Sequence, residues 1–272
     1  MFKKRVTHVS SSYHNFYFVN SKRAQVTIFI ILAIVIVAAG ILIYFFLPSI
    51  RTSFQPTNPE QFIESCVFDG FDETLKTIST QGGSLDPEPY LLYRNTKIQY
   101  GCYTNEYYRL CVMQQPLLQR SIEEILEKDL NDKEKNCFQE LKSDYEQKGY
   151  RVQIERNTTF IEFLPKHVRV DLQARVTLTK DNVQVYDDFS FDQRSGLYEL
   201  ISIASSILNW EARYGEAEST IYMAYYPQIK IEKNKLGEGS TVYVISNRNT
   251  QELFTIASRS LVLPPGYGTN YV

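Results

Sequence analysis

Few residues in this chain of 272 amino acids have the types and spacing that catalysis requires. His167 is the single histidine after residue 51, in a stretch that favours a surface residue over a general base. The sequence contains no H-E-x-x-H, G-x-S-x-G, G-x-x-x-x-G-K-[ST], G-x-G-x-x-G or EF-hand spacing. We therefore expect no catalytic residue, no cofactor and no enzymatic activity.

Two sets of carboxylates are candidates for reactive or metal-binding groups. Asp187, Asp188 and Asp192 could surround a cation, because hard ions take oxygen ligands. Asp187 and Asp188 are neighbours on an expected strand and point to opposite faces, so we expect no metal site. Glu123 and Glu124 could form an acid–base pair, but adjacent residues of a helix point about 100° apart, which favours a solvent-exposed face.

All four cysteines follow residue 51, and their even number favours disulfide bonds in an exported domain. The sequence alone allows three pairings, and the absence of C-x-x-C argues against zinc. Cys102 and Cys111 bracket a short hairpin-like loop, whereas Cys66 and Cys137 lie on the apolar faces of two expected helices. We predict the pairs Cys102–Cys111 and Cys66–Cys137.

The apolar run Val26–Leu47 contains no charged residue. As a helix it would be roughly 33 Å long, enough to cross a hydrocarbon core of roughly 30 Å. A secretory signal peptide usually has a shorter apolar region that ends in a small-residue cleavage site, and this run ends in Tyr44-Phe45-Phe46-Leu47. We expect a single transmembrane helix at 25–50.

The charges beside this run predict its orientation. Residues 1–24 contain basic residues and no acidic ones, and the basic residues are Lys3, Lys4, Arg5, Lys22 and Arg23. By the positive-inside rule the leader, 1–24, is cytoplasmic and residues 52–272 lie outside the cell membrane. The bilayer is then the first expected partner.

The start of the run carries a more specific signal, Lys22-Arg23-Ala24-Gln25-Val26-Thr27. It resembles the class III (prepilin-type) signal of archaeal type IV pilins and archaellins, with a basic pair, a small residue and then Gln. The resemblance implies cleavage between Ala24 and Gln25 by a prepilin-type peptidase and a pilin-like filament subunit. Phe29 stands where that family has an acidic residue.

More loosely, the whole chain resembles uncharacterised archaeal membrane-anchored surface proteins with an AQVTIFII start, a Cys-bearing outer domain and a QGG segment. Five of the 29 Lys and Arg residues lie in the leader, which leaves 24 against 31 Asp and Glu. The outer part therefore has a net charge near −7, and we expect no nucleic-acid partner.

We expect the outer part to have an α+β fold with helices packed on an antiparallel sheet. A helical, Cys-containing region at 51–149 would hold one helix from Pro59 to Gly82 and an irregular stretch at 84–115. A helix from Pro116 would then break or bend at Asn131-Asp132, and a further helix would carry Cys137 and end at Gly149. From 150 to 272 the period of two predicts antiparallel strands, with one covering helix after Ser195.

The outer part has two candidate surface features. Tyr100, Tyr103, Tyr107 and Tyr108 are candidates for partner binding, because tyrosine offers rigid amphipathic contact area. Packing against the neighbouring helices is the favoured alternative for these rings. Asn157 begins an Asn-Thr-Thr sequon in an expected surface turn, which makes it a candidate for glycosylation.

These observations lead to one main functional hypothesis. The chain is expected to be a single-pass cell-surface protein whose outer domain is non-catalytic and acts by binding or structure, with a pilin-like filament subunit as the narrower form. Its partners would be the bilayer, further copies of itself or another surface protein. The competing hypothesis is a membrane-anchored enzyme or solute-binding module.

Overall fold

The computed structural model describes residues 29–39 and 58–264. The chain divides into two compact units, Met1–Pro56 and Thr57–Val272, and each is described by itself. In the first unit residues 29–39 form a helix with exposed apolar side chains. Within the two described ranges no helix is both long enough and apolar enough to cross a membrane. The leader, Ala24, Gln25 and the rest of the expected transmembrane helix lie outside the described residues.

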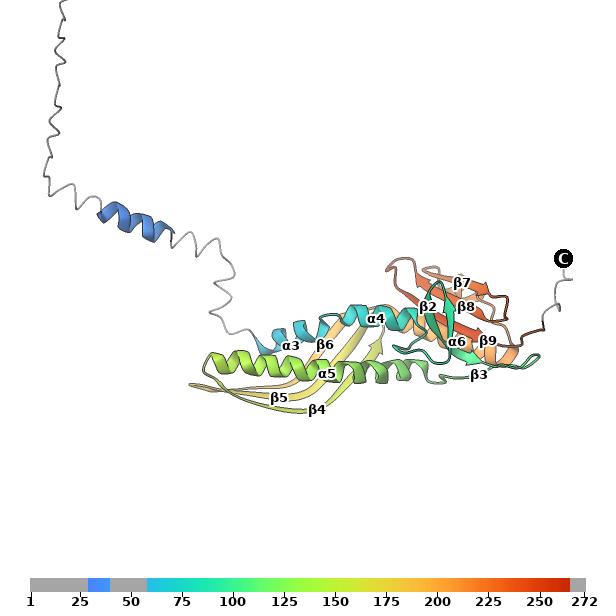
Figure 1. Cartoon of the computed structure of the whole chain (residues 1–272), viewed down its shortest axis with the longest axis horizontal. Coiled ribbons are helices and arrows are strands. Elements are labelled where there is room, and N and C mark those ends of the chain that lie inside the picture. The colour runs from blue at the N-terminus through green and yellow to red at the C-terminus, as the bar shows by residue number, and fades with distance from the viewer. Residues whose placement is uncertain (1–28, 40–57, 265–272) are drawn as a thin grey trace, which may run out of the picture. The chain divides into compact units, whose positions relative to one another are not determined.

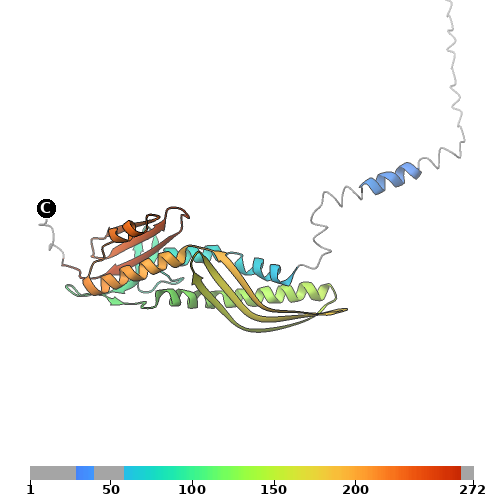
Figure 2. The same cartoon turned by 180° about the vertical axis from the view of Figure 1, so that it is seen from behind.

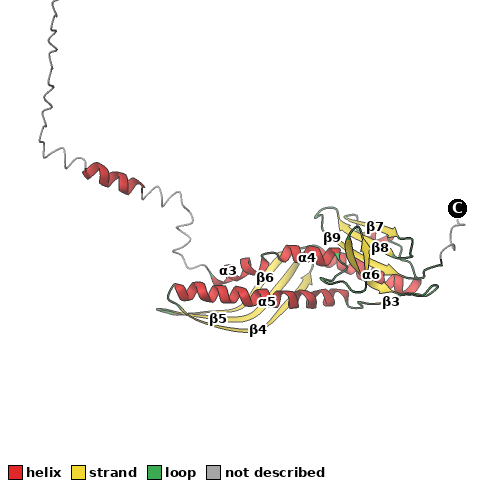
Figure 3. Ribbon diagram, viewed as in Figure 1, coloured by secondary structure: helices red, strands yellow, loops and turns green. Residues whose placement is uncertain are grey.

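Residues 58–264 form an α+β domain with two sheets (Figure 1; Figure 3). The helices in this range are α3 (Pro59–Phe68), α4 (Phe71–Thr80), α5 (Leu118–Gln147), α6 (Leu197–Tyr214) and α7 (Thr220–Tyr225). The first sheet has the order β4 (Arg151–Leu164), β5 (His167–Thr179), β6 (Val183–Arg194). The second contains β1 (Tyr90–Tyr93), β2 (Thr96–Tyr103), β3 (Val112–Met113), β7 (Ile229–Lys235), β8 (Thr241–Asn247) and β9 (Leu253–Arg259).

The helix expected from Pro59 to Gly82 is in fact two helices. The side chain of Asn58 caps α3 by accepting a hydrogen bond from the N–H of Glu60 at 3.0 Å. The break comes at Gly70, which adopts a φ of 73°, a left-handed conformation that interrupts the helix and that glycine tolerates. Gly70 is therefore the residue in the sequence that indicates the break between α3 and α4.

In contrast, α5 runs without interruption through Asn131 and Asp132, where a break or a bend was expected. Its buried stripe continues on both sides of that point, so packing outweighs the low helix propensity of Asn and Asp. The buried apolar residues of the stripe include Ile122, Leu126, Leu130, Cys137, Phe138 and Leu141.

The first sheet is antiparallel throughout and curves along α5 (Figure 2). Its inner face packs on the helices through aromatic pairs, with 5.6 Å between the ring centroids of Phe138 and Phe189. The turn expected at Asn157 is absent. Residues 151–164 instead form one long strand with a register shift between Arg156 and Thr159.

The second sheet corrects two expectations. Residues 84–115 are not irregular, because they contribute β1, β2 and β3. β2 pairs with β9 in parallel, so the sheet is mixed and combines strands from both sides of residue 149. Its path is β1-β2-β9-β8-β7, with β3 added to β2. The expected division at residue 149 therefore does not separate two sheets.

α6 is the covering helix predicted after Ser195. Leu200, Ala204, Ile207 and Leu208 are each 0% exposed and pack against the core. The short helix α7 beside it was not expected. Thus α6 follows directly on β6 of the first sheet and packs on the second.

Both predicted disulfide bonds are present. Cys66 in α3 is joined to Cys137 in α5, and Cys102 in β2 is joined to Cys111 just before β3. The described residues contain no free cysteine. The first bond ties the start of this domain to its longest helix.

Candidate functional site

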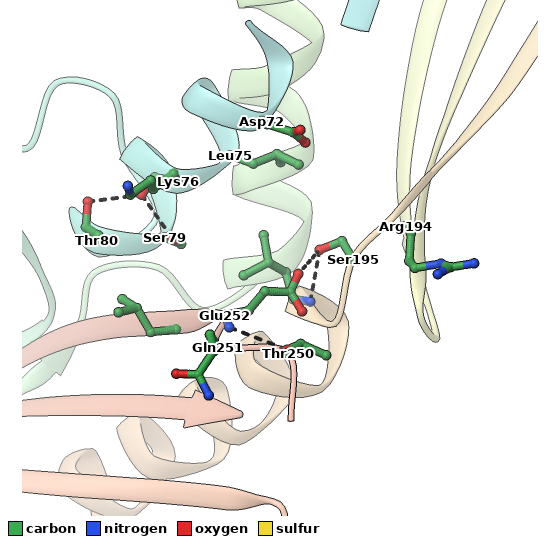
Figure 4. Close-up of a pocket in the computed structure, with 12 residues that line it drawn as sticks. Asp72, Leu75, Lys76, Ser79, Thr80, Arg194, Ser195, Thr250, Gln251 and Glu252 are labelled. Carbon is green, nitrogen blue, oxygen red and sulfur yellow. Dashed lines mark hydrogen bonds between the residues drawn. The ribbon is translucent and has the colours of Figure 1, made fainter. Parts of the chain in front are cut away.

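A groove lies where α4, the end of β6, the start of α6 and the β8–β9 turn meet (Figure 4). It consists of a narrow pocket of about 270 Å³ and a wider trough of about 1290 Å³. The two are lined in common by Asp72, Arg194, Ser195, Thr250 and Glu252. They are therefore parts of one continuous groove.

The narrow pocket has an apolar floor. Leu75 of α4 and Leu197 of α6 are 6% and 4% exposed, and Leu253 of β9 lies beside them in the lining. The hydroxyl groups of Ser79 and Thr80 are turned back onto their own helix, because each donates to the carbonyl of Lys76. The pocket is thus suited to an apolar group.

Glu252 lies in the lining of the groove, where the β8–β9 turn meets the start of α6. Its carboxylate accepts hydrogen bonds from Ser195 Oγ at 2.9 Å and from the N–H of Gly196 at 2.8 Å. Ser195 Oγ in turn accepts from the N–H of Leu197 at 3.2 Å. Glu252 therefore satisfies the amino-terminal end of α6, where a negative charge is also favoured by the helix dipole.

The other two carboxylates of the groove also have donors. Asp72 accepts from Gln193 Nε2 at 2.9 Å, and Glu199 accepts from Gln228 Nε2 at 2.9 Å. All four residues line the trough. The trough is consequently held together by links between α4 and β6 and between α6 and the segment before β7.

The cations of the groove, unlike its carboxylates, have no partner among the described residues. The side chains of Lys76, Lys166 and Arg194 are exposed, and among the described residues none of them has a hydrogen-bond or ion-pair partner. Figure 4 shows Lys76 and Arg194 on opposite sides of the Ser195–Glu252 pair. Three cations of the groove therefore lack a partner, beside three carboxylates that each accept a hydrogen bond from a neutral group.

The aspartates that were considered as a metal site form ion pairs instead. Asp187 pairs with Arg175 at 2.5 Å, and Asp192 pairs with Arg169 at 3.0 Å. The hydrogen bond from Arg169 lowers the pKa of Asp192 below its ordinary value. In the part of the chain that the structure describes, no group of three His, Cys, Asp or Glu residues is placed to hold a metal ion.

His167 lies beside the same aspartate, with 3.6 Å between its Nε2 and Asp192 Oδ1. No serine or cysteine Oγ or Sγ is hydrogen-bonded to this ring among the described contacts. The ring therefore lies beside the cross-strand ion pair of Arg169 and Asp192.

Glu123 was expected on a solvated helix face, and this expectation was wrong. It is 6% exposed and accepts a hydrogen bond from the N–H of Phe163 at 3.1 Å. Glu124 is exposed and pairs with Arg120 at 3.1 Å. The two carboxylates lie on different sides of α5 and do not form a pair.

The four candidate tyrosines do not form one exposed surface. Tyr100 is 6% exposed, and its hydroxyl lies 2.9 Å from Ser240 Oγ. Tyr103 packs on it, with 4.8 Å between ring centroids, whereas Tyr107 and Tyr108 are exposed. Packing therefore accounts for the first two rings. Asn157 is exposed beside the register shift in β4.

A buried carboxylate, which the sequence did not reveal, lies in the core. Glu211 of α6 is 2% exposed and accepts hydrogen bonds from the Tyr243 hydroxyl, from Ser258 Oγ at 2.9 Å and from the N–H of Ala217 at 2.9 Å. Burial, with the nearby charge of Glu211, raises the pKa of Tyr243 above its ordinary value. With its acceptors engaged, Glu211 fixes α6 to the second sheet.

Sequence reasoning missed the groove because its residues come from segments far apart in the chain. Lys76 and Arg194 carried no local motif, and Glu252 stands in a turn after Asn247. Comparison with protein-family models, with curated proteins and with solved structures gave no match.

Proposed function

We propose that this protein is a single-pass, membrane-anchored cell-surface protein whose outer domain acts by binding. The observation that carries the proposal is the pair of disulfide bonds in a domain that follows a basic leader and a long apolar run. Disulfides persist in oxidising compartments, and the positive-inside rule directs the same domain outward. The two arguments are independent and agree.

Binding is favoured over catalysis by the way the charged groups are used. The carboxylates considered for chemistry are engaged in ion pairs or in hydrogen bonds to backbone, as at Asp187, Asp192 and Glu123. The groove between α4 and α6 remains open and has unpaired cations. Such a groove with few convergent polar groups is typical of a ligand site.

A filament subunit is the narrower form of the proposal. It is favoured by Lys22-Arg23-Ala24-Gln25, which matches a prepilin-type signal. In this form a peptidase removes residues 1–24, and the apolar helices of several copies pack together. N-terminal peptide mapping of membrane-extracted protein tests it, with Gln25 expected as the first residue. Recovery of intact leader on most molecules would leave an uncleaved anchor.

The test of the main proposal is protease treatment of intact cells. We expect residues 58–264 to be removed from the cell while a cytoplasmic marker survives. Non-reducing peptide mapping of the released material should contain the Cys66–Cys137 and Cys102–Cys111 links. Full protection of the domain, under conditions that cut a known surface protein, would contradict the orientation.

A further inference from the structure

We propose that Asn157 carries an N-linked glycan and that the sugar is attached before the first sheet forms. The chain contains one Asn-x-Ser/Thr sequon with x other than Pro, and it is Asn157-Thr158-Thr159. The inference rests on the outward orientation in the proposed function, because this modification belongs to exported domains. It is carried by the contrast between an exposed asparagine and a buried hydroxyl within one sequon.

The first step concerns the β-bulge that contains Asn157. In β4 the two residues Asn157 and Thr158 lie opposite the single residue Gln173 of β5. Both bulge residues are exposed, and the side chain of Asn157 makes no hydrogen bond among the described residues. Asparagine is also disfavoured in strands. Folding therefore does not account for an asparagine here, and its amide is free to carry a substituent.

The second step concerns the space around Asn157. The helix α5 packs on the inner face of the first sheet, as Figure 2 shows, and Asn157 lies on the outer face. The neighbouring side chains on that face are those of Glu155, Gln173 and Arg175, and all three are exposed. A glycan on Asn157 therefore extends into solvent without displacing any part of the described fold.

The third step concerns Thr159, the hydroxyl residue of the sequon. The sequon requires a hydroxyl two residues after the asparagine. Thr159 is 8% exposed, and its hydroxyl donates a hydrogen bond to the carboxylate of Glu134 in α5, which is 4% exposed. Glu134 is held in place by Arg156, with 3.0 Å between the paired atoms. An enzyme that meets the folded domain therefore finds the amide of Asn157 but not the hydroxyl of Thr159.

The fourth step concerns the order of the strands in the chain. β4 pairs with β5, and both β5 and β6 follow it in sequence. A strand without its partners is not stable in water, so β4 stays open until the later strands have been exported. During that interval Asn157 and Thr159 are both accessible. The sugar is therefore attached before folding, and the folded domain is a poor substrate.

The reaction is a glycosyl transfer from a lipid-linked donor. Nδ2 of Asn157 attacks the anomeric carbon of a glycan carried on a polyprenyl phosphate or diphosphate. A C–N bond forms as the C–O bond to phosphate breaks, and the lipid phosphate leaves with the bonding electrons. Nδ2 loses one proton to a base of the transferase. The step needs no oxidant or reductant.

The site is tested by peptide mapping of the full chain, purified from membranes of the cells that naturally produce it. We expect the tryptic peptide that contains Asn157 to carry an added sugar mass on most molecules. Asn157→Gln should abolish the addition, and circular dichroism should show an unchanged fold because this side chain is exposed. Unmodified Asn157 on most molecules would overturn the proposal.

The order of events is tested with a second sequon. Gln184→Thr gives Asn182, in the β5–β6 turn, a hydroxyl two residues later, and both positions are exposed in the fold. Unglycosylated chain with this change is folded in detergent and incubated with an oligosaccharyltransferase and a lipid-linked glycan. Asn157 should react at least about tenfold more slowly than Asn182, because its reaction requires β4 to open. Chain diluted into the reaction from urea and reductant should be modified at both sites.

The glycan proposal and the surface-protein proposal fail in different ways. Release of the domain from intact cells by protease, with Asn157 unmodified, would contradict the glycan and leave the surface-protein proposal standing. Protection of the domain from protease, again with Asn157 unmodified, would contradict both. Equal rates at Asn157 and Asn182 in the folded chain would overturn the order of attachment and folding.

Discussion

The carboxylate of Glu123 in α5 accepts a hydrogen bond from the backbone N–H of Phe163 in β4, with 3.1 Å between the two atoms. One helical turn later, Glu127 accepts from the N–H of Ile161 at 3.2 Å. β4 is an edge strand of the first sheet, so its outward N–H groups need partners. α5 supplies those partners with side chains, and the edge is closed to further strands.

Glu123→Ala should therefore destabilise the outer domain. The substitution leaves the buried N–H of Phe163 without an acceptor, which costs about 1–3 kcal/mol. Denaturant unfolding of the purified chain measures the loss, and hydrogen exchange at Phe163 should accelerate. Glu124→Ala is the control, since that side chain is 61% exposed and its removal should change the unfolding free energy by less than about 0.5 kcal/mol. Equal effects of the two variants would contradict this role.

Alkaline pH should destabilise the fold through buried tyrosines. Burial raises the pKa of Tyr145 to about 12 and raises that of Tyr243 as well, from an ordinary value of 10.0. Between pH 10 and 12 the unfolded chain loses these protons while the folded chain keeps them, so the free energy of unfolding falls as pH rises. Below pH 10 this stability is fully present.

Denaturant titrations across this pH range measure that slope. Each buried tyrosine contributes at most about 1.4 kcal/mol per pH unit. Tyr145→Phe should make the profile shallower, because phenylalanine has no proton to lose. A free energy of unfolding that stays constant up to pH 12 would show that these hydroxyls ionise equally in both states.

The parts of the fold that could be predicted from sequence are those with local causes. The alternation of Val168, Val170 and Leu172 predicts β5, and the apolar stripe after Ser195 predicts α6. The disulfide pairs followed from the placement of the cysteines on expected elements. For the strand and the helix, neighbouring residues carry the whole signal, and the cysteine pairs depend on the elements that such signals predict.

The parts that could not be predicted depend on distant segments. β2 pairs with β9, and Tyr100 opposes Ala257, a partner that no local period indicates. The continuity of α5 through Asn131 is set by its packing against α3 and β4, which outweighs local propensity. The groove depends on Lys76, Arg194 and Glu252 meeting in three dimensions.

The packing of α6 on β2 is sensitive to one methyl group. A Cβ at Gly101 would lie 2.9 Å from Leu208 Cδ2, closer than van der Waals contact permits. Gly101→Ala should therefore cost about 1–3 kcal/mol, as overpacked cores do. Gly237→Ala is the matched control, because its Cβ would have no neighbour within 4 Å. A Gly101 variant as stable as the Gly237 variant would mean that α6 shifts freely on the sheet.

The two disulfide bonds should differ in their contribution to stability. Cys66 and Cys137 are 71 residues apart, whereas Cys102 and Cys111 are 9 apart. On the chain-entropy argument the longer loop contributes roughly 4.4 kcal/mol and the shorter roughly 2.5. Replacing Cys66 and Cys137 by Ser should therefore lower the melting temperature further than replacing Cys102 and Cys111.

The positions of the two disulfide bonds in the fold predict the same order of stability as the lengths of their loops. The bond from Cys66 holds α3 against α5, so its loss also frees the first helix of the domain, whereas the bond from Cys102 closes a loop whose ends are already paired through β2 and β3. Differential scanning calorimetry of both double variants, each compared with the unmodified chain under non-reducing conditions, measures the order. If the Cys102/Cys111 variant melts first, the loop before β3 stabilises the second sheet more than α3 stabilises the first.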